Sequence, residues 1–228
     1  MIRAVIFDMD GVLIDSEPIW RKVEARVYQK MGLPVTENTL LATMGTRIDK
    51  AVEYIYQMHP WGPTPTLAHV TNRILKGVEE EIRAHGVLKE EVAQALSLCK
   101  KRGVGIALAS STTVRLIRVT LETLHLTHFF QVMHSGELET HPKPAPDIYL
   151  TTAHMLKVKP EECIAIEDSP VGVVSAKAAG MKCIAVVDPH HASDPRYEIA
   201  DVRINSLKDF NEKIWNKLII RRLSSIKS

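Results

Sequence analysis

The sequence lacks the features that mark secreted, membrane-spanning and nucleic-acid-binding proteins. Its three cysteines, Cys99, Cys163 and Cys183, are widely spaced within apolar stretches, which predicts buried reduced thiols and not a disulfide framework. Lysine and arginine (29) nearly balance aspartate and glutamate (27), so we expect no nucleic-acid partner. Apolar runs such as 183–187 stop far short of the ~20 residues that cross a bilayer. The N-terminus also shows no secretory signal pattern, and we expect a cytoplasmic protein without a membrane partner.

What the sequence does contain is an alternation of strand and helix patterns. Apolar runs at 4–7, 104–109 and 163–166 end abruptly in polar residues, which is typical of strands buried on both faces of a parallel sheet. Weaker runs of the same kind occupy 129–133 and 181–187. Helical periodicity fills the intervals at 90–102, 113–126, 145–156 and 171–179. The pattern predicts an α/β layer structure with right-handed crossovers.

One long interval, between about residues 15 and 85, contains no convincing strand. It holds three amphipathic segments, at 16–31, 47–59 and 66–85, and Ser16 is positioned to cap the first of them, with Pro18 in its first turn. We therefore predict a helical insert. The expected division is a core of residues 1–15 and 86–228 and a helical cap of residues 16–85.

Polar side chains gather at the predicted carboxyl ends of the strands, where loops of an open parallel sheet share one crevice. They are Asp8 and Asp10, Ser110 and Ser111, and Glu167 and Asp168, with Lys143 in the loop before the helix expected at 145–156. Paired carboxylates in one crevice repel each other unless a cation binds between them, and Mg²⁺ prefers oxygen ligands. The lysine and the hydroxyls are suited to hold the oxygens of an anion. The set indicates Mg²⁺-assisted phosphoryl transfer.

Simpler explanations exist for most of these residues. Glu167 and Asp168 could open a helix and complement its dipole, Ser110 and Ser111 could cap the helix from about residue 113, and Lys143 could be solvated. The acids of the first strand are harder to explain in this way, because two carboxylates at the end of a buried strand cost stability without a cation.

Four segments resemble the motifs of the haloacid dehalogenase-like hydrolases, in the order found in that superfamily. They read FDMDGVLIDSE at 7–17, ALASS at 107–111, KPAPDIY at 143–149 and IEDSPVG at 166–172. The resemblance implies a Rossmannoid parallel-sheet core with an all-helical cap inserted after the first motif, which agrees with the helical insert inferred from periodicity.

The resemblance also implies roles for individual residues. Asp8 would attack phosphorus and form an aspartyl phosphate, and Asp10 would protonate the leaving group and then deprotonate water. Mg²⁺ would be held by the Asp8 carboxylate, the Asp10 backbone carbonyl and Asp168, with Glu167 as a direct or water-linked ligand. Ser110 and Lys143 would bind phosphate oxygens.

Within this superfamily, dehalogenases and phosphonatases lack an acid at position 10, whereas β-phosphoglucomutases carry a cap histidine where this chain has Trp20. A phosphatase is therefore expected, with a sugar phosphomutase or a phosphoaccepting signalling module as alternatives. Glu17, Trp20, Thr46 and Arg47 are the candidate substrate contacts from the cap, although Trp20 could be core packing and Arg47 a surface charge.

The narrower pattern around 15–20 and 45–49 is similar to bacterial hexitol and 2-deoxyglucose-6-phosphate phosphatases. We expect a monomer that acts on a small phosphorylated sugar or polyol. Histidines at His125 and His128, and at His190 and His191, lack the accompanying ligands of a zinc site. The basic residues of the tail at 219–228 are expected to be solvated.

Overall fold

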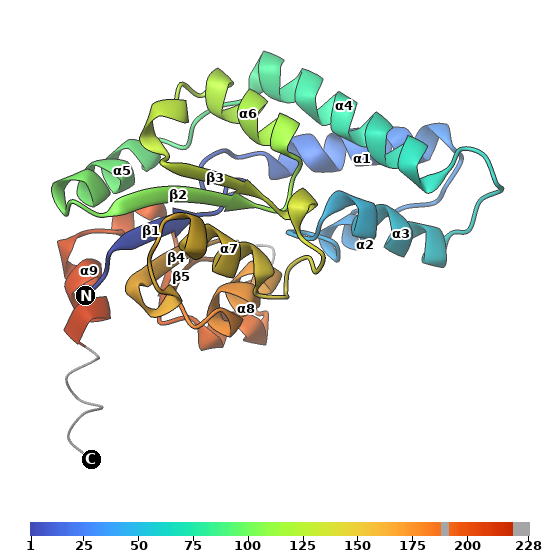
Figure 1. The fold of residues 1–228 in the computed structure, drawn as a ribbon. Helices are drawn as coiled ribbons and strands as arrows, with labels where there is room; N and C mark the ends of the chain where they lie inside the picture. The colour runs from blue at the N-terminus through green and yellow to red at the C-terminus, as the bar shows by residue number, and fades with distance from the viewer. Residues whose placement is uncertain (188–191, 221–228) are drawn as a thin grey trace.

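A computed structural model describes residues 1–187 and 192–220, and its centre is a six-stranded sheet (Figure 1). All neighbouring strands are parallel, in the order β3-β2-β1-β4-β5-β6. The strands are β1 (Ala4–Phe7), β2 (Gly105–Ser110), β3 (Val132–Ser135), β4 (Cys163–Glu167), β5 (Lys182–Val186) and β6 (Val202–Ile204). The predicted parallel α/β fold is confirmed. The edge strand β6 was not predicted, because three residues are too few for a periodicity signal.

The described part of the chain contains nine α-helices. They are α1 (Glu17–Lys30), α2 (Glu37–Leu41), α3 (Ile48–Met58), α4 (Leu67–His85), α5 (Val92–Lys101), α6 (Val114–Thr123), α7 (Asp147–Met155), α8 (Pro170–Ala178) and α9 (Glu212–Ile220). Short 3₁₀ turns are η1 (Thr127–Phe129), η2 (Gly136–Leu138), η3 (Pro160–Glu162), η5 (Pro195–Ile199) and η6 (Leu207–Asp209). The seven predicted helices are confirmed within a few residues at their ends. The sequence pattern indicated neither α2, which has only five residues, nor α9.

The apolar runs of the strands are continuous because both faces of the sheet are covered. In β1, Val5 and Phe7 belong to one hydrophobic cluster and Ala4 and Ile6 to the other, as the two-residue repeat of a strand requires. Helices α7 and α8 contribute to the second cluster, whereas α5, α6 and α9 contribute to the first. The result is a three-layer arrangement with the sheet in the middle.

Helices α1 to α4 follow β1 directly and lie toward the end of the sheet where its strands finish (Figure 1). Helix α4 packs against α1, α3 and also α6, and Val23 and Ile74 join the same hydrophobic cluster as β1. The two segments that enter and leave these helices meet in a bridge between Ile14 and Leu88. No helix of the described ranges has both the length and the apolar character needed to span a membrane.

Ser16 occupies the N-cap position of α1 but does not cap it. Its side chain accepts no hydrogen bond from the first turn and instead donates to Asp10 Oδ1 at 2.5 Å. The capping prediction for Ser16 is therefore wrong, because its backbone has helical angles (φ −92°, ψ −15°), whereas a capping side chain needs the extended backbone of an N-cap residue. The predicted solvated tail lies outside the described residues from position 221 onward.

Candidate active site

The strand order places the predicted acids at one point of the sheet edge. From β1 the chain continues to β2 and β3 on one side, and β4 to β6 lie on the other, so the loops after β1 and β4 flank a switch point where open α/β sheets bind ligands. Phe7 lies opposite both Leu108 and Ile166, and the Asp8 amide donates to the Ile166 carbonyl at 2.9 Å. Asp8 thus lies between the ends of β2 and β4.

Lys143 connects the ends of β1 and β4 through a buried ion cluster. Its Nζ is 2.6 Å from Asp8 Oδ1 and 2.5 Å from Glu167 Oε1. The residue is only 4% exposed, so the alternative of a solvated lysine is wrong. Burial of a lysine is tolerated here because two carboxylates compensate its charge, and they raise its pKa above the usual value although burial acts in the opposite direction.

Glu167 is fixed in place by several further donors. The hydroxyl of Tyr149 donates to Oε1 at 2.5 Å and the hydroxyl of Ser169 to Oε2 at 3.2 Å. A Cβ atom at Gly172 would lie 2.1 Å from the same carboxylate, so the first turn of α8 approaches it too closely for any side chain. Tyr149 stands in the third motif, but no role was predicted for it from the sequence. Its hydroxyl orients Glu167.

Asp8, Glu167 and Asp168 form a buried carboxylate cluster whose potential ligand atoms all lie within 4.8 Å of one another. Burial raises the pKa of Asp8 to about 8 against the opposing effect of Lys143. Burial, followed by the charges of Asp8 and Glu167, also raises the pKa of Asp168 well above its usual value. A divalent cation would relieve this repulsion, and an all-oxygen donor set suits a hard ion such as Mg²⁺.

Gly11, the residue after Asp10, lies so close to the Asp168 carboxylate that no side chain fits at this position. Gly11 has φ +70°, and a Cβ atom there would lie 1.7 Å from Asp168 Oδ2. Both the left-handed conformation and the contact exclude larger residues.

Asp10 lies beside the cluster but has a different set of partners. Its Oδ1 accepts from Ser16 and, at 3.0 Å, from the indole Nε1 of Trp20. Ser110 Oγ is 3.4 Å from Oδ2. Trp20 is therefore more than core packing, although it also touches the hydrophobic cluster. Ser110 and Ser111 do not cap α6; Thr113 does.

A concave pocket, partly open to solvent, lies between the strand ends and the first three helices, and small molecules bind preferentially in such clefts. Of the predicted residues, it is lined by Asp8, Asp10, Ser110, Ser111, Asp168, Glu17, Trp20 and Thr46. Lys143 and Glu167 lie behind this wall in the ion cluster and contact Asp8 directly or through each other.

The loop between α2 and α3 closes one side of the cavity. Ser111 Oγ donates to the Gly45 carbonyl at 3.0 Å, and a Cβ atom at Gly45, which has φ +73°, would lie 2.5 Å from Ser169. Thr46, the next residue, lines the cavity.

Arg47 is not among the residues that line the cavity. Its guanidinium pairs with Asp49 and donates to the carbonyls of Gly136, at 3.1 Å, and Glu139, at 2.9 Å. It joins the start of α3 to the η2 turn, a role that neither of the two predictions for this residue described.

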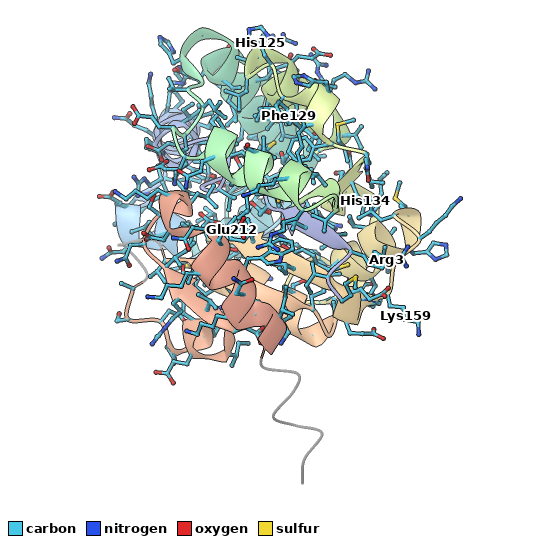
Figure 2. All side chains as sticks on the ribbon, turned by 90° about the vertical axis from the view of Figure 1, so that its left-hand side faces the viewer. Arg3, His125, Phe129, His134, Lys159 and Glu212 are labelled. Atoms are coloured by element: carbon cyan, nitrogen blue, oxygen red, sulfur yellow. The ribbon has the colours of Figure 1, made fainter. Side chains whose placement is uncertain are left out.

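The histidines do not form a metal site in the described part of the chain, where the carboxylate cluster alone meets the geometric requirement. His128 lies against the Phe129 ring, 4.2 Å between centroids. Figure 2 views the end of the sheet that lies away from α1 to α4, and there His125 and His134 lie far apart. His134 is buried, and its Nε2 is 2.6 Å from Glu139 Oε1. His190 and His191 lie outside the described residues.

Glu24, on α1, is a cavity-lining residue that the sequence analysis missed. It is 8% exposed, and its Oε2 has no hydrogen-bond partner among the described residues. Burial, and secondarily the charge of Glu17, raise its pKa to about 8. A seven-residue spacing from Glu17, which puts both on one face of a helix, was the available sequence signal.

This pKa predicts a pH-dependent stability. Between the ordinary value of 4.5 and about 8 the folded chain holds a proton on Glu24 that the unfolded chain has lost, so the free energy of unfolding falls as pH rises through this window. At ~1.4 kcal/mol per pKa unit, we expect wild type to lose about 2–4 kcal/mol more than Glu24→Gln between pH 5 and pH 8, measured by urea unfolding. Parallel curves for the two proteins would contradict the assignment.

The chain is similar to a family of hydrolases, to two phosphatases and to a solved structure. The profile of the haloacid dehalogenase-like hydrolases matches residues 5–186. The chain is 37% identical over 213 residues to hexitol phosphatase B of Escherichia coli strain K12, covering 93% of this chain and 96% of that protein. It is 36% identical over 186 residues to a phosphorylated carbohydrates phosphatase of Thermotoga maritima, covering 80% and 84%. Among solved structures, a β-phosphoglucomutase from Clostridium difficile has a TM-score of 0.86 at 20% identity, covering 98% and 100%, which is a likeness of fold.

Proposed function

Since the chain belongs to the haloacid dehalogenase-like hydrolase family, we propose that it is a Mg²⁺-dependent phosphatase of small phosphorylated sugars or polyols. The observation that carries this proposal is the Asp8 carboxylate, held at a strand end by Lys143 inside a carboxylate cluster, with Asp10 beside it in the cavity wall. Relatives at 36–37% identity bear the names of a hexitol phosphatase and a phosphorylated carbohydrates phosphatase, which supports this substrate class.

The proposed reaction uses two carboxylates in two steps. Asp8 attacks phosphorus, a bond forms between its oxygen and phosphorus, and the ester P–O bond breaks while Asp10 gives a proton to the leaving alkoxide. Asp10 then takes a proton from a water molecule, which attacks the aspartyl phosphate and releases inorganic phosphate. Ser110, Ser111 and Lys143 bind the phosphoryl oxygens and offset their charge.

The metal would be held by the carboxylates of Asp8 and Asp168 and the Asp10 carbonyl. Glu167 would serve as a direct or water-linked ligand, in addition to orienting Lys143, which it contacts at 2.5 Å. When bound, Mg²⁺ would supply positive charge against the phosphoryl oxygens.

We also propose that residues 16–85 act as a cap on a core of residues 1–15 and 86–228. Helix α1 and the loop around Gly45 provide one side of the cavity, so movement of this segment would admit substrate and then exclude water. The bridge between Ile14 and Leu88 marks the two connections.

The test is phosphate release from a panel of hexose, hexitol and pentose phosphates, with Mg²⁺ and with EDTA. Sustained turnover that is lost in EDTA and restored by Mg²⁺ supports the proposal. Conversion of one sugar phosphate isomer to another without net phosphate release would instead indicate a phosphomutase. Stoichiometric labelling of the protein without turnover would indicate a signalling module.

Asp10→Asn tests the acid and base roles separately. We expect kcat to fall by about 10²–10⁴-fold for an alkyl phosphate, because an amide neither protonates the alkoxide nor deprotonates water. With p-nitrophenyl phosphate, whose leaving group needs no acid, phosphoenzyme should still form and be seen by acid quench, while its hydrolysis is slow. Unchanged steady-state turnover in this variant would refute the assigned role.

A further inference from the structure

The wall of the cavity contains a buried carboxyl group of which one oxygen has no hydrogen-bond partner among the described residues. Glu24 Oε2 has no hydrogen-bond partner among the described residues, although the residue is 8% exposed. Leaving a buried polar group unpaired costs stability, and native structures contain few such groups. Because Glu24 also lines the cavity, a ligand is the natural partner.

Helix α1 places Glu24 at a defined depth in the cavity. Its cavity-lining residues Glu17, Trp20, Arg21 and Glu24 follow the three- and four-residue spacing of one helix face. The indole of Trp20 donates to Asp10 at 3.0 Å. The turn of α1 that carries Trp20 therefore lies beside the acid that protonates the leaving oxygen in the proposed reaction. Glu24 lies one turn further along, about 6 Å on the helix axis.

The α2–α3 segment adds both apolar and polar side chains to the lining of the cavity. Leu40, Met44, Ile48 and Ala51 are apolar, and Thr43 and Thr46 carry hydroxyl groups. A lining of this mixed kind suits a chain or ring of hydroxylated carbons, which carries both hydroxyl groups and C–H surface.

We propose that Glu24 is a specificity-determining residue that hydrogen-bonds a hydroxyl group at the end of the substrate remote from the phosphate. The substrate class is then a five- or six-carbon polyol or sugar monophosphate, since such a chain still carries hydroxyl groups beyond a full helical turn of α1 from Asp10. The inference rests on the proposed function, because that function places the phosphate at Asp8 and the rest of the substrate toward Glu24.

The chemistry of the substitutions follows from the protonation of Glu24. Burial raises the pKa of Glu24 to about 8, so its side chain is a protonated carboxylic acid at neutral pH. This group donates one hydrogen bond through its O–H and accepts another at its carbonyl oxygen. Glutamine keeps both capacities, whereas leucine has neither. Leucine also removes the unpaired polar atom, so Glu24→Leu is expected to fold.

The experiment measures binding, so that it does not depend on turnover. Sorbitol 6-phosphate and glycerol 3-phosphate are titrated by calorimetry, with Mg²⁺, into three proteins: the Asp8→Asn parent, and the same parent with Glu24→Gln or with Glu24→Leu added. We expect Glu24→Leu to weaken binding of the hexitol phosphate by about tenfold or more, with a several-fold smaller loss for glycerol phosphate. Glu24→Gln should stay within about threefold of the parent. Glu80→Gln, at an exposed position on α4, is the matched control and should change neither affinity.

Two results would overturn the inference: equal affinity of the parent for the two phosphates, or an equal loss for both in Glu24→Leu. Failure of the proposed function would be seen separately, as absence of phosphate release by the wild-type protein. The two failures are therefore distinguishable.

Discussion

Asp8→Asn is expected to abolish turnover, with kcat reduced by at least about 10⁴-fold, because an amide cannot form the aspartyl phosphate and loss of a covalent nucleophile has effects of this size. The fold should survive. The substitution is nearly isosteric. It removes the Asp8 charge from the pair with Lys143, which keeps Glu167 as a partner, and it also removes one of the carboxylates that repel each other in the cluster of Asp8, Glu167 and Asp168. The melting temperature in EDTA should therefore stay close to that of the wild type.

The same variant reports on the metal site. Mg²⁺ that binds the folded chain stabilises it by mass action, so the wild-type melting temperature should rise with Mg²⁺ and that of Asp8→Asn should rise less. Asp15→Asn is the matched control, since Asp15 is exposed and belongs to the same N-terminal segment; it should retain activity and the full response to Mg²⁺. Residual turnover of Asp8→Asn above about 1% of wild type would contradict the nucleophile assignment.

Lys143→Met is expected to have the largest effect on stability. It removes the ammonium group that contacts Asp8 at 2.6 Å and Glu167 at 2.5 Å and leaves buried carboxylates unpaired. Breaking such a pair costs about 3–5 kcal/mol. We expect a loss of this size in urea unfolding without metal, together with a fall in kcat/KM of about 10²–10³-fold from the lost charge on the phosphoryl oxygens.

The pH dependence and a double variant separate charge from packing. The charges of Asp8 and Glu167 hold the pKa of Lys143 above its usual value against the effect of burial, so Lys143 itself stays charged from about pH 5 to pH 9, and any pH dependence of its effect in this range comes from its carboxylate partners. In Lys143→Met the deficit should be larger at pH 8 than at pH 5, because protonation of a carboxylate relieves the repulsion.

Adding Glu167→Gln to Lys143→Met should recover part of the stability, since it removes one unpaired charge. Lys50→Met, at a solvent-exposed position beside Glu53, should have no measurable effect. If the double variant is as unstable as the sum of the single variants, the loss arises from packing and not from charge.

The predictions from sequence were accurate where a structural property depends only on residues that are close together along the chain. Strands buried on both faces give continuous apolar runs, so β1, β2 and β4 were located closely, as was the polar residue that ends each. They failed where an element is short, as for α2 and β6, or where a side chain has a choice of partners. The Ser16 hydroxyl donates to Asp10 and does not cap its own helix. The Arg47 guanidinium donates to the carbonyls of Gly136 and Glu139.

The sequence by itself determined the parallel α/β class, the helical insert and the residue types at the strand ends, because each follows from local periodicity or from neighbours along the chain. Only the tertiary structure decided which of these groups touch. Lys143 and Asp8 are 135 positions apart, Ser110 and Asp10 are 100 apart, and their contact depends on the order of strands in the sheet. Burial is likewise a property of packing, so the unpaired Glu24 on the cavity wall was visible only once α1 to α3 had been placed around it.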